Sequence, residues 1–497
     1  MSSVKQEKLH ILFHLNSIGG AVESEKLHEW NEAVDSFFFS LQIHLTSGGV
    51  HPLPCALKNS KSTSLETINE SNSCKLEENV VQILNEVLAK AISTSQVGTG
   101  GADSSDVRQQ YLSNVICALR NVYRLLSLLH DSNAPTQIAE KLKTLDIFSF
   151  LTHIVAENSA LAVNASMALF QGMRNDPVTM NMFIDELKGI PLLAEAFVTS
   201  GCVALQVSLV KHFHQLLGYT ISRRMLMIFG DLNDALSGAL ANDSTDFVRA
   251  LVATMAWAVR SEPRFPGNDN DHRADLVEEV LQLLLAIQPM YTGRYAAQVK
   301  SSTSQEDKKE TMTQLGIILC DILHIPNADS RAYRCKLAVV MLLMDMPNEY
   351  SQYLWVNKGV GQLVSILSLQ LSEIVIEKRK NSSIGALPIL VVLNKLTQAN
   401  PAIKKFVEDE VFPQVENPSD SSTKIKMNMK PIDAPWGSLR WKLIELMTSN
   451  DSNLKRCASE LLWTICGSSD RFVKRTGYGN AVHMLGIKGL VQLPKGV

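Results

Sequence analysis

The apolar residues of this chain recur with the period of an α-helix along most of its length. One stretch shows the i, i+3, i+4, i+7 spacing of an amphipathic helix, at Leu112, Val115, Ile116, Leu119, Val122, Tyr123 and Leu126. Comparable patterns occur at Val80–Ile92, Ala160–Met173, Ala204–Leu217, Phe247–Val259, Leu276–Ile287, Thr313–Leu323, Arg334–Met344, Gly361–Ile376, Leu387–Leu396, Leu439–Met447 and Lys455–Cys466. We find no series of alternating strands bounded by hairpin turns. The pattern predicts an all-α protein.

The breaks between these stretches are short and have the residues that end and begin helices. Asp176–Pro177, Gly189–Pro191, Met346–Asn348 and Asn400–Pro401 each place a proline where one helix stops and the next begins. Helices of about three turns that recur roughly every 40 to 45 residues are typical of armadillo and HEAT arrays. We therefore expect an armadillo/HEAT-like superhelix, an α-solenoid, with a concave groove that holds peptides or helices.

Four polar stretches interrupt the pattern. Residues 51–73, 93–106, 295–309 and 415–435 have too little apolar surface to offset the entropy of ordering. We expect a repeat array over residues 1–414 with mobile insertions near the first three stretches. A flexible loop at 415–435 would then lead to a C-terminal helical block, residues 436–497, that closes the array.

Composition narrows the class of function. The chain has 497 residues, 45% of them hydrophobic and 20% charged, with a formal net charge of −3. This overall charge gives no support for a nucleic-acid partner or for a membrane-surface partner. The N-terminus lacks the apolar core of a signal peptide, and we expect no integral membrane segment. The eight cysteines are scattered without a CxxC pair, so we expect buried thiols, a cytoplasmic location and no zinc site.

Candidate chemistry is sparse. The glycine cluster at 98–101 is followed by no GKS or GKT, which favours a linker over a phosphate-binding loop. His212 and His214 are two residues apart and face different sides of a helix, so they cannot share a metal ion. GxSxG, HExxH and the kinase motifs are absent. We predict no catalytic residue, no metal and no cofactor, and a protein that is not an enzyme.

Two basic features have a structural and a functional interpretation. Glu377–Lys380 ends a long helix, where cations are favoured by the helix dipole. Arg120 and Arg124 lie one turn apart on an otherwise apolar helix, which sets two guanidinium groups side by side. Such a pair either forms a solvated ridge or grips a carboxylate or carbonyl groups in a groove. The pattern alone leaves both interpretations open.

The C-terminal segment Leu439–Gly489 resembles a known family. It has a helix ending in KLIELMT, a helix LKRCASELLWTIC, the string RFVKRTGYGNA at Arg471–Ala481, and a last helix AVHMLGIKGL. Upstream, Leu387–Pro413 looks like the helix pair that precedes this block. These elements, in this order, resemble the synembryn family (resistance to inhibitors of cholinesterase type), chaperones and exchange factors of heterotrimeric G-protein α subunits. The similarity in letters covers roughly a quarter of the chain.

The resemblance implies a function and a set of residues. It implies that the groove holds the C-terminal helix of Gα, favours GDP release and stabilises the nucleotide-free Gα fold. It implies that Arg120 and Arg124 grip that helix, with Gln171 as the amide one repeat later, where Asn is more usual in the family. It also implies recruitment to the inner face of the plasma membrane through Gα, and we expect a monomer. A long acidic tail, present in the better-known members, does not follow Ala481.

The string TGYGN reads as a structural corner. We expect Gly477 and Gly479 to adopt backbone angles closed to other residues, Tyr478 to pack on the preceding helix, and Asn480 to cap the following one. The leading hypothesis is a Gα-binding chaperone and exchange factor. The alternatives are an armadillo-type scaffold that binds another protein without exchange activity, and an enzyme whose site is not apparent in the sequence.

Overall fold

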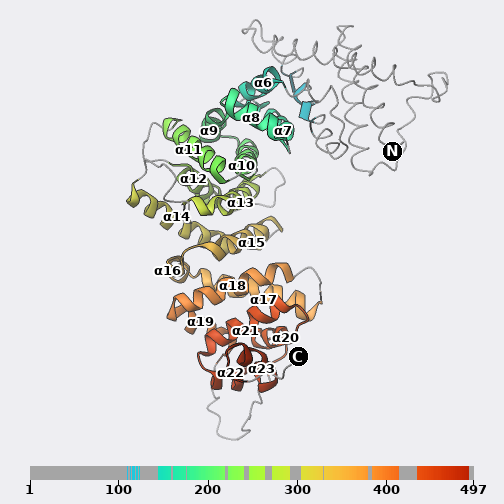
Figure 1. The fold of residues 1–497 in the computed structure, drawn as a ribbon, viewed down its shortest axis with the longest axis vertical. Helices are drawn as coiled ribbons and strands as arrows, with labels where there is room; N and C mark the ends of the chain where they lie inside the picture. Colours follow the sequence, from blue (N-terminus) through green and yellow to red (C-terminus); the bar gives the residue numbers. More distant parts are fainter. Residues whose placement is uncertain are drawn as a thin grey trace, which may run out of the picture. The chain divides into compact units, whose positions relative to one another are not determined.

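The computed structural model describes residues 144–157, 160–174, 176–218, 222–239, 246–262, 271–291, 304–327, 330–378, 383–413 and 434–491, with single positions between Gln109 and Tyr123. Within these residues every regular element is a helix (Figure 1). The predicted all-α, helical-repeat fold is therefore confirmed. The chain divides into two compact units, unit 1 (residues 1–241) and unit 2 (residues 242–497). The sequence pattern did not predict this division.

Unit 1 is built from two layers of helices. Its elements are α6 (Leu145–Ala156), α7 (Ala162–Met173), α8 (Pro177–Asn181), the π-helical turn η4 (Met182–Glu186), α9 (Gly189–Thr199), α10 (Val203–Gly218) and α11 (Ser222–Ala239). Helices α6, α9 and α11 pack in succession, and α7 packs beside α10. Alternate helices thus return to the same layer, as expected for stacked repeats.

Unit 2 repeats this arrangement over more helices. It contains α12 (Phe247–Arg260), α13 (Arg273–Tyr291), α14 (Gln305–His324), α15 (Ser330–Asp345), α16 (Tyr350–Val356), α17 (Gly359–Leu371), η5 (Ser372–Ile376), α18 (Ser383–Ala399), α19 (Pro401–Val411), α20 (Leu439–Met447), α21 (Ser452–Cys466), α22 (Ser469–Thr476) and α23 (Tyr478–Ile487). Helices α13, α15, α18 and α21 form one layer. Helices α12, α14, α17 and α20 form the other. The helices after residue 435 therefore continue the layers that precede them.

Lys-Gly junctions mark the start of a repeat helix in each unit. Lys188 and Lys358 have φ of 53° and 56°, which ends the preceding turn. A Cβ on Gly189 would lie 2.1 Å from the ring of Phe183, and one on Gly359 would lie 2.9 Å from Leu354. Each glycine is needed because the next helix begins directly against a buried side chain. The two junctions are separated by about four repeats of armadillo or HEAT length.

The predicted helix starts at Asp176–Pro177 and Asn400–Pro401 are confirmed. Asp176 Oδ1 accepts hydrogen bonds from the backbone N–H groups of Val178 and Thr179, at 3.0 and 3.3 Å. Asn400 Oδ1 accepts from the N–H of Ala402, at 2.9 Å. In both cases proline occupies the first turn, where its missing N–H costs no helical hydrogen bond.

Two lysines, the half-buried Lys395 and the buried Lys442, donate to carbonyl groups of helices that precede them in the stack. Lys395 on α18 donates from Nζ to the carbonyl oxygens of Met344, at 2.8 Å, and Met346, beyond the end of α15. Lys442 on α20 donates to the carbonyl oxygen of Ser368 near the end of α17, at 3.2 Å. Burial lowers the pKa of both lysines. The bonds from Lys395 satisfy carbonyl groups at a helix end. The carbonyl of Ser368 accepts in addition from the N–H and hydroxyl of Ser372.

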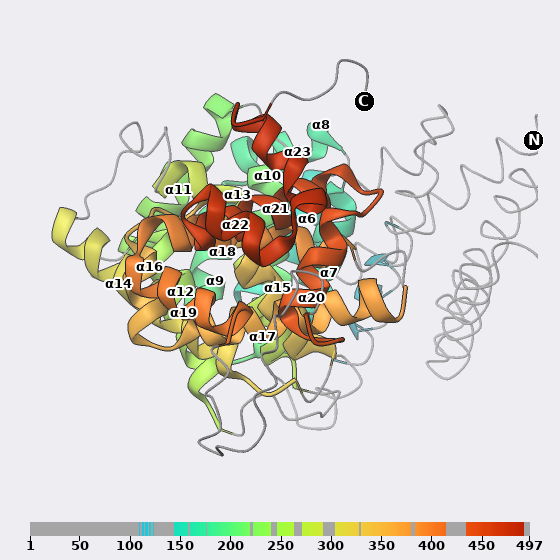
Figure 2. The ribbon, with the colours of Figure 1, turned by 90° about the horizontal axis from the view of Figure 1, so that it is seen from below.

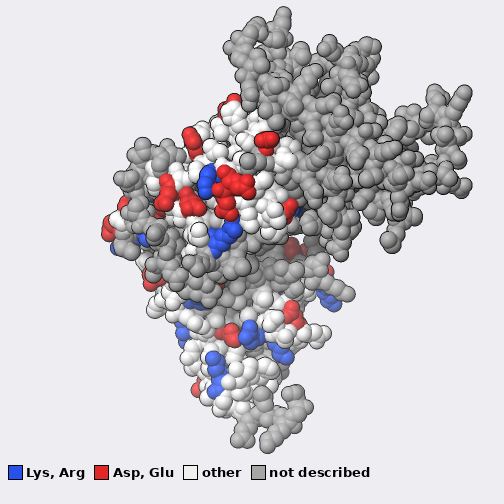
Figure 3. Space-filling view, turned by 45° about the horizontal axis from the view of Figure 1, so that its top comes forward, with Lys and Arg blue, Asp and Glu red and all other residues white. Residues whose placement is uncertain are grey.

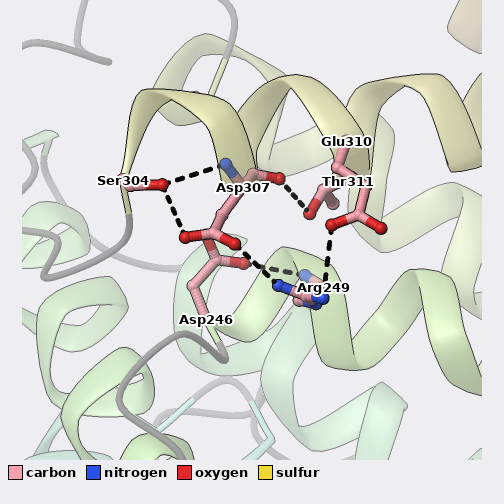
Figure 4. A network of polar contacts seen from close by, with 6 residues as sticks. All are labelled: Asp246, Arg249, Ser304, Asp307, Glu310 and Thr311. Carbon is pink, nitrogen blue, oxygen red and sulfur yellow. Dashed lines mark hydrogen bonds and ion pairs between the residues drawn. The ribbon is translucent and has the colours of Figure 1, made fainter.

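The polar stretch at 295–309 is in part a helix, which corrects the sequence-based prediction. Helix α14 begins at Gln305, and Ser304 caps it by accepting from the N–H of Asp307, at 3.1 Å. Figure 4 shows the contacts that fix this turn: Arg249 on α12 reaches Asp307 at 3.3 Å and Glu310 at 3.5 Å. Ion pairs with the neighbouring helix replace the apolar contacts that the first turns lack. The predicted insertions at 51–73 and 93–106, and nearly all of the loop at 415–435, lie outside the described residues.

One helical stretch is more apolar than expected. Within the described residues, Gly359–Ile376 is the stretch long and apolar enough to cross a membrane, by length and composition. The sequence had led us to expect none. Leu363, Ile366 and Leu367 are buried, and α17 contacts α14, α18 and α20. Its apolar character is accounted for by packing within unit 2, since a core helix of a stack is enclosed by neighbours.

The string Arg471–Ala481 docks α22 onto α19. Arg471 Nη2 and Arg475 Nη1 both donate to Glu408 Oε1, the second at 2.9 Å. The guanidinium of Arg475 also lies 4.3 Å from the ring centroid of Phe412. Phe472 is fully buried against Trp463. One carboxylate with two arginines, together with a buried ring, holds the end of the stack in place.

The corner after α22 forms as predicted at Gly477 and differs at the three residues that follow. Gly477 has φ of 86°, which favours glycine. Helix α23 begins directly at Tyr478, whose side chain projects outward and is 59% exposed. Gly479 lies inside α23 without a positive φ. Asn480 is already too far into α23 to cap it, and donates instead to the carbonyl of Thr476 at the end of α22, at 2.8 Å.

Candidate functional site

Of the predicted binding residues that the structure describes, Gln171 lies on α7 of unit 1, and Arg120 contacts the same helix. The face of α7 that packs inward has small residues, Ala165, Ala168 and Gly172, which let α7 approach its neighbours closely. A Cβ on Gly172 would lie 2.8 Å from Phe148 of α6. Close packing on that side leaves Asn164, Met167 and Gln171 on the less buried side of the helix.

Arg120 lies against α7. Its Nη1 donates to Asn164 Oδ1 at 3.0 Å and contacts Met167 Sδ at 3.6 Å. The guanidinium is half-buried and keeps further donors, because Arg has five N–H groups. Arg124, the expected second member of the pair, lies outside the described residues. The amide that contacts Arg120 is Asn164, two turns before the predicted Gln171 on the same helix.

Gln171 and Gln215 hold polar atoms that no protein group satisfies. The Oε1 atom of Gln171 on α7 is buried without a hydrogen-bond partner, and so are both Oε1 and Nε2 of Gln215 on α10. A buried polar atom without a partner costs about 1–3 kcal/mol. Each of these atoms is shielded from solvent, so it can hydrogen-bond a bound segment only after its side chain turns outward. We refer to Arg120, Asn164, Met167, Gln171 and Gln215 as the α7–α10 strip.

A buried histidine fixes how α7 and α10 pack beneath the strip. His212 Nε2 donates to the carbonyl of Ser166 at 2.8 Å, and its ring meets Phe170 edge-on with centroids 5.6 Å apart. Ser166 and Ser208 share a hydrogen bond of 2.7 Å. Burial lowers the pKa of His212 to about 4, so the ring is neutral at pH 7. His214 is half-exposed, in keeping with the prediction that the two histidines face different ways.

Contacts between α7 and α10 join residues that lie one repeat apart in the sequence. Ser166 and Ser208 are 42 residues apart, and the Phe170–His212 pair has the same separation. Arg120 and Asn164 are separated by 44 residues. These values agree with the period of 40 to 45 residues expected from the sequence, and they show that the strip crosses successive repeats.

Charged side chains also cluster elsewhere on unit 1. Acidic side chains gather on one part of the described surface in Figure 3. Burial and the nearby carboxylate of Asp234 raise the pKa of Asp231 on α11, while Lys188 opposes this rise. Arg224 pairs with Asp185 at 2.9 Å. These are charge interactions on an exposed helix surface, one of them an ion pair, and they bring together no acid and base around a nucleophile.

The strip is suited to binding rather than to a chemical step. Its donors and acceptors are a guanidinium and amides, which hydrogen-bond without exchanging protons at neutral pH. Among the described residues, no group of three His, Cys, Asp or Glu side chains lies close enough to hold a metal ion. The six described cysteines are free.

Sequence reasoning found part of this strip and missed the rest. Arg120 and Gln171 were predicted, whereas Asn164 and Gln215 were not. Asn164 could have been found, since Asn164, Met167 and Gln171 follow a single helical stripe at i, i+3 and i+7. Gln215 carries no such signal, because only the packing of α10 on α7 shows that its amide is buried and unsatisfied.

Helices that stack in two layers, with contacts repeated about every 42 residues, define a helical-repeat protein. A family model described as guanine nucleotide exchange factor synembryn matches residues 137–495. This chain belongs to that family.

Individual relatives share about a quarter of their residues with this chain over the matched regions. Chaperone Ric-8A of Pongo abelii is 23% identical over 359 residues, which cover 67% of this chain and 63% of the relative. Chaperone Ric-8A of Rattus norvegicus is 24% identical over 407 residues, covering 74% and 71% of the two chains. Chaperone Ric-8B of Mus musculus is 28% identical over 182 residues, covering 36% and 32%.

Proposed function

We propose that this protein binds G-protein α subunits and acts as their folding chaperone and guanine-nucleotide exchange factor. The observation that carries the proposal is the α7–α10 strip, where Gln171 and Gln215 hold unsatisfied amide atoms beside the Arg120–Asn164 pair. Membership of the synembryn family supports it. The strip has the donors and acceptors that a helix C-terminus needs, since free carbonyls and a terminal carboxylate are acceptors for Arg and amide N–H groups.

In this proposal exchange needs no covalent step. The strip holds the C-terminal helix of Gα in its displaced position, so the protein binds the open state of Gα better than the closed, GDP-bound state. Preferential binding of one state shifts the population toward it, which speeds GDP release and protects the newly made fold. We also propose that the protein is a cytoplasmic monomer that reaches the membrane together with Gα. In this proposal Arg124 contacts the Gα helix beside Arg120.

The test is GDP release from a purified Gα subunit, followed by fluorescence with and without the protein. We expect faster release and co-purification of nucleotide-free Gα. Binding with unchanged release would support a scaffold without exchange activity instead. Absence of both binding to a Gα C-terminal peptide and rescue of Gα folding would reject the proposal.

The strip itself is tested with Gln171→Ala plus Gln215→Ala. Two lost hydrogen bonds should weaken binding of the Gα peptide roughly tenfold. The free protein should be no less stable than the parent, because the substitution removes amide atoms that have no partner. The control is Gln314→Ala plus Gln352→Ala, two exposed amides on α14 and α16 of unit 2. Equal binding by the two double variants would remove these amides from the site.

A further inference from the structure

The last helices of unit 2 present apolar side chains on the outside as well as the inside. Helix α23 packs inward through Ala481, Met484 and Leu485, which are buried. On its other sides Tyr478 is 59% exposed and Ile487 is 56% exposed, and Leu490 just beyond it is 56% exposed. Several large apolar side chains exposed on one short helix and just beyond it exceed the scattered single residues of an ordinary protein surface. Within the described residues, no helix covers these outer side chains.

These residues lie at one end of unit 2. Figure 1 shows α22 and α23 as the outermost helices of that unit, and Figure 2 looks onto them directly. We call the exposed residues there, Lys474, Tyr478, His483, Ile487, Lys488 and Leu490, the C-terminal end face. They form no groove, since Lys474 lies on α22, Tyr478, His483 and Ile487 lie on different sides of α23, and Lys488 and Leu490 follow α23.

This end of the chain is basic, although the whole protein is slightly acidic. Between Trp436 and Val491 there are eight Lys and Arg residues against four Asp and Glu residues, a formal charge of +4, compared with −3 for the chain. Arg471 and Arg475 are paired with Glu408. The exposed cations of the end face are Lys474 and Lys488, with His483 beside them and Asp470 as the acid of the same short helix pair.

We propose that the C-terminal end face binds the surface of an anionic lipid bilayer. Aromatic and aliphatic side chains interleaved with lysines are the composition that partitions into the interface between headgroups and acyl chains. A bilayer needs no matching groove, which suits side chains projecting from a convex end. A positive region of a net negative protein would also orient it toward negative lipid, since each lysine near such a surface strengthens binding about fivefold. This proposal does not rest on the proposed function, because it needs no Gα.

The test is co-sedimentation of the full chain with vesicles, without any G protein. We expect binding to vesicles of phosphatidylcholine with phosphatidylserine, and at least tenfold weaker binding to phosphatidylcholine alone. Raising the salt concentration should weaken the interaction with the mixed vesicles, because the lysine contribution is screened.

Two pairs of variants separate the end face from general charge and apolarity. Lys474→Gln plus Lys488→Gln should weaken binding to the anionic vesicles more than tenfold, whereas Lys308→Gln plus Lys309→Gln on α14, with the same charge change, should not. Tyr478→Ser plus Leu490→Ser should also weaken it, whereas Val178→Ser plus Met227→Ser should not. Val178 and Met227 are apolar residues of unit 1 that are more exposed than Tyr478 and Leu490.

Three outcomes would overturn the inference. The first is that the parent protein binds neutral and anionic vesicles with equal affinity, or binds neither. The second is that the end-face variants and their controls lose binding equally. The third is that sedimentation shows self-association of the parent and a monomer for Tyr478→Ser plus Leu490→Ser. That result would assign the C-terminal end face to contact with a second copy of the chain.

Discussion

Single residues set how closely the helices of this protein approach one another and where they begin. Gly189 and Gly359 lie where a side chain would collide with Phe183 and Leu354. The lysine before each glycine adopts a left-handed conformation and ends the previous turn. Lys-Gly pairs followed by a branched apolar residue are visible in the sequence, but the contact that makes the glycine necessary is visible only in the fold. The side chain that would collide, Phe183 or Leu354, belongs to the preceding helical turn, so the Lys-Gly pair itself does not show the contact.

The Lys-Gly junction leads to a stability prediction. Gly189→Ala should lower the free energy of unfolding of unit 1 by about 1–3 kcal/mol, because the new methyl group forces the buried Phe183 ring to move. Gly201→Ala is the control, since a Cβ there meets nothing within 4 Å. Urea unfolding of the full chain measures both. Restoration of stability by Phe183→Leu in the Gly189→Ala background would identify the ring as the cause, and equal stability of the two alanine variants would contradict the packing argument.

The buried His212 leads to a prediction of how the free energy of unfolding depends on pH. Its pKa is lowered to about 4 by burial, compared with 6.5 when unfolded. Between these values the unfolded chain binds the proton and the folded chain does not, so stability is complete above pH 6.5 and falls as the pH drops toward 4. We expect His212 to account for a loss of about 2 kcal/mol between pH 7 and pH 5.

Comparison of unfolding at pH 7 and pH 5 checks this expectation. His212→Leu should reduce the loss, whereas His214→Leu, two residues along the same helix and half-exposed, should retain it. An unchanged pH dependence in His212→Leu would show that other groups are responsible.

Whole helices were predictable where their apolar faces are buried over most of their length. Phe247–Val259 was predicted and α12 is Phe247–Arg260, while Leu439–Met447 coincides with α20. The start of α14 was missed because its first turns are polar and are held by Ser304 and Arg249, which come from outside the periodic stretch. The same limit applies to the α7–α10 strip. Arg120 and Asn164 meet across 44 residues, and no period within one helix reports such a contact.

The docking of α22 on α19 leads to a prediction at the scale of whole helices. Glu408→Gln should weaken it by about 1–2 kcal/mol, because Arg471 and Arg475 lose a nearly buried charged acceptor while Arg471 itself stays half-exposed. Hydrogen exchange of the α22 and α23 amides should become faster than in the parent. The neighbouring Asp409→Asn removes an exposed i, i+4 pair with Lys405 and should change exchange little. If both variants exchange alike, the shared carboxylate does not anchor the corner.

At the scale of the whole molecule, the chain consists of two compact units, each with its own layers and its own core. Stability in stacked repeats is approximately a sum of local terms and nearest-neighbour contacts. Disturbance in one unit is therefore expected to remain largely within it. The sequence pattern showed continuous periodicity and gave no sign of the division, because the boundary depends on how many contacts cross it and not on local composition.

The two units should lose structure separately. Under increasing urea, hydrogen exchange should show one transition for the amides of α6–α11 and another for those of α12–α23. Gly189→Ala should shift the first and Glu408→Gln the second. A single transition that both variants shift equally would show that the units unfold together.

The shared carboxylate of Glu408 has a consequence for inherited or selected variation in the string RFVKRTGYGNA. Since Arg471 and Arg475 hold α22 onto α19 within unit 2, substitutions in the string should lower the amount of protein that survives quality control while leaving each surviving molecule active. A loss of 1–2 kcal/mol can change cellular abundance several-fold. Defects of this type would be expected to worsen with growth temperature and to be relieved by raising expression, which a defect in the strip would not be.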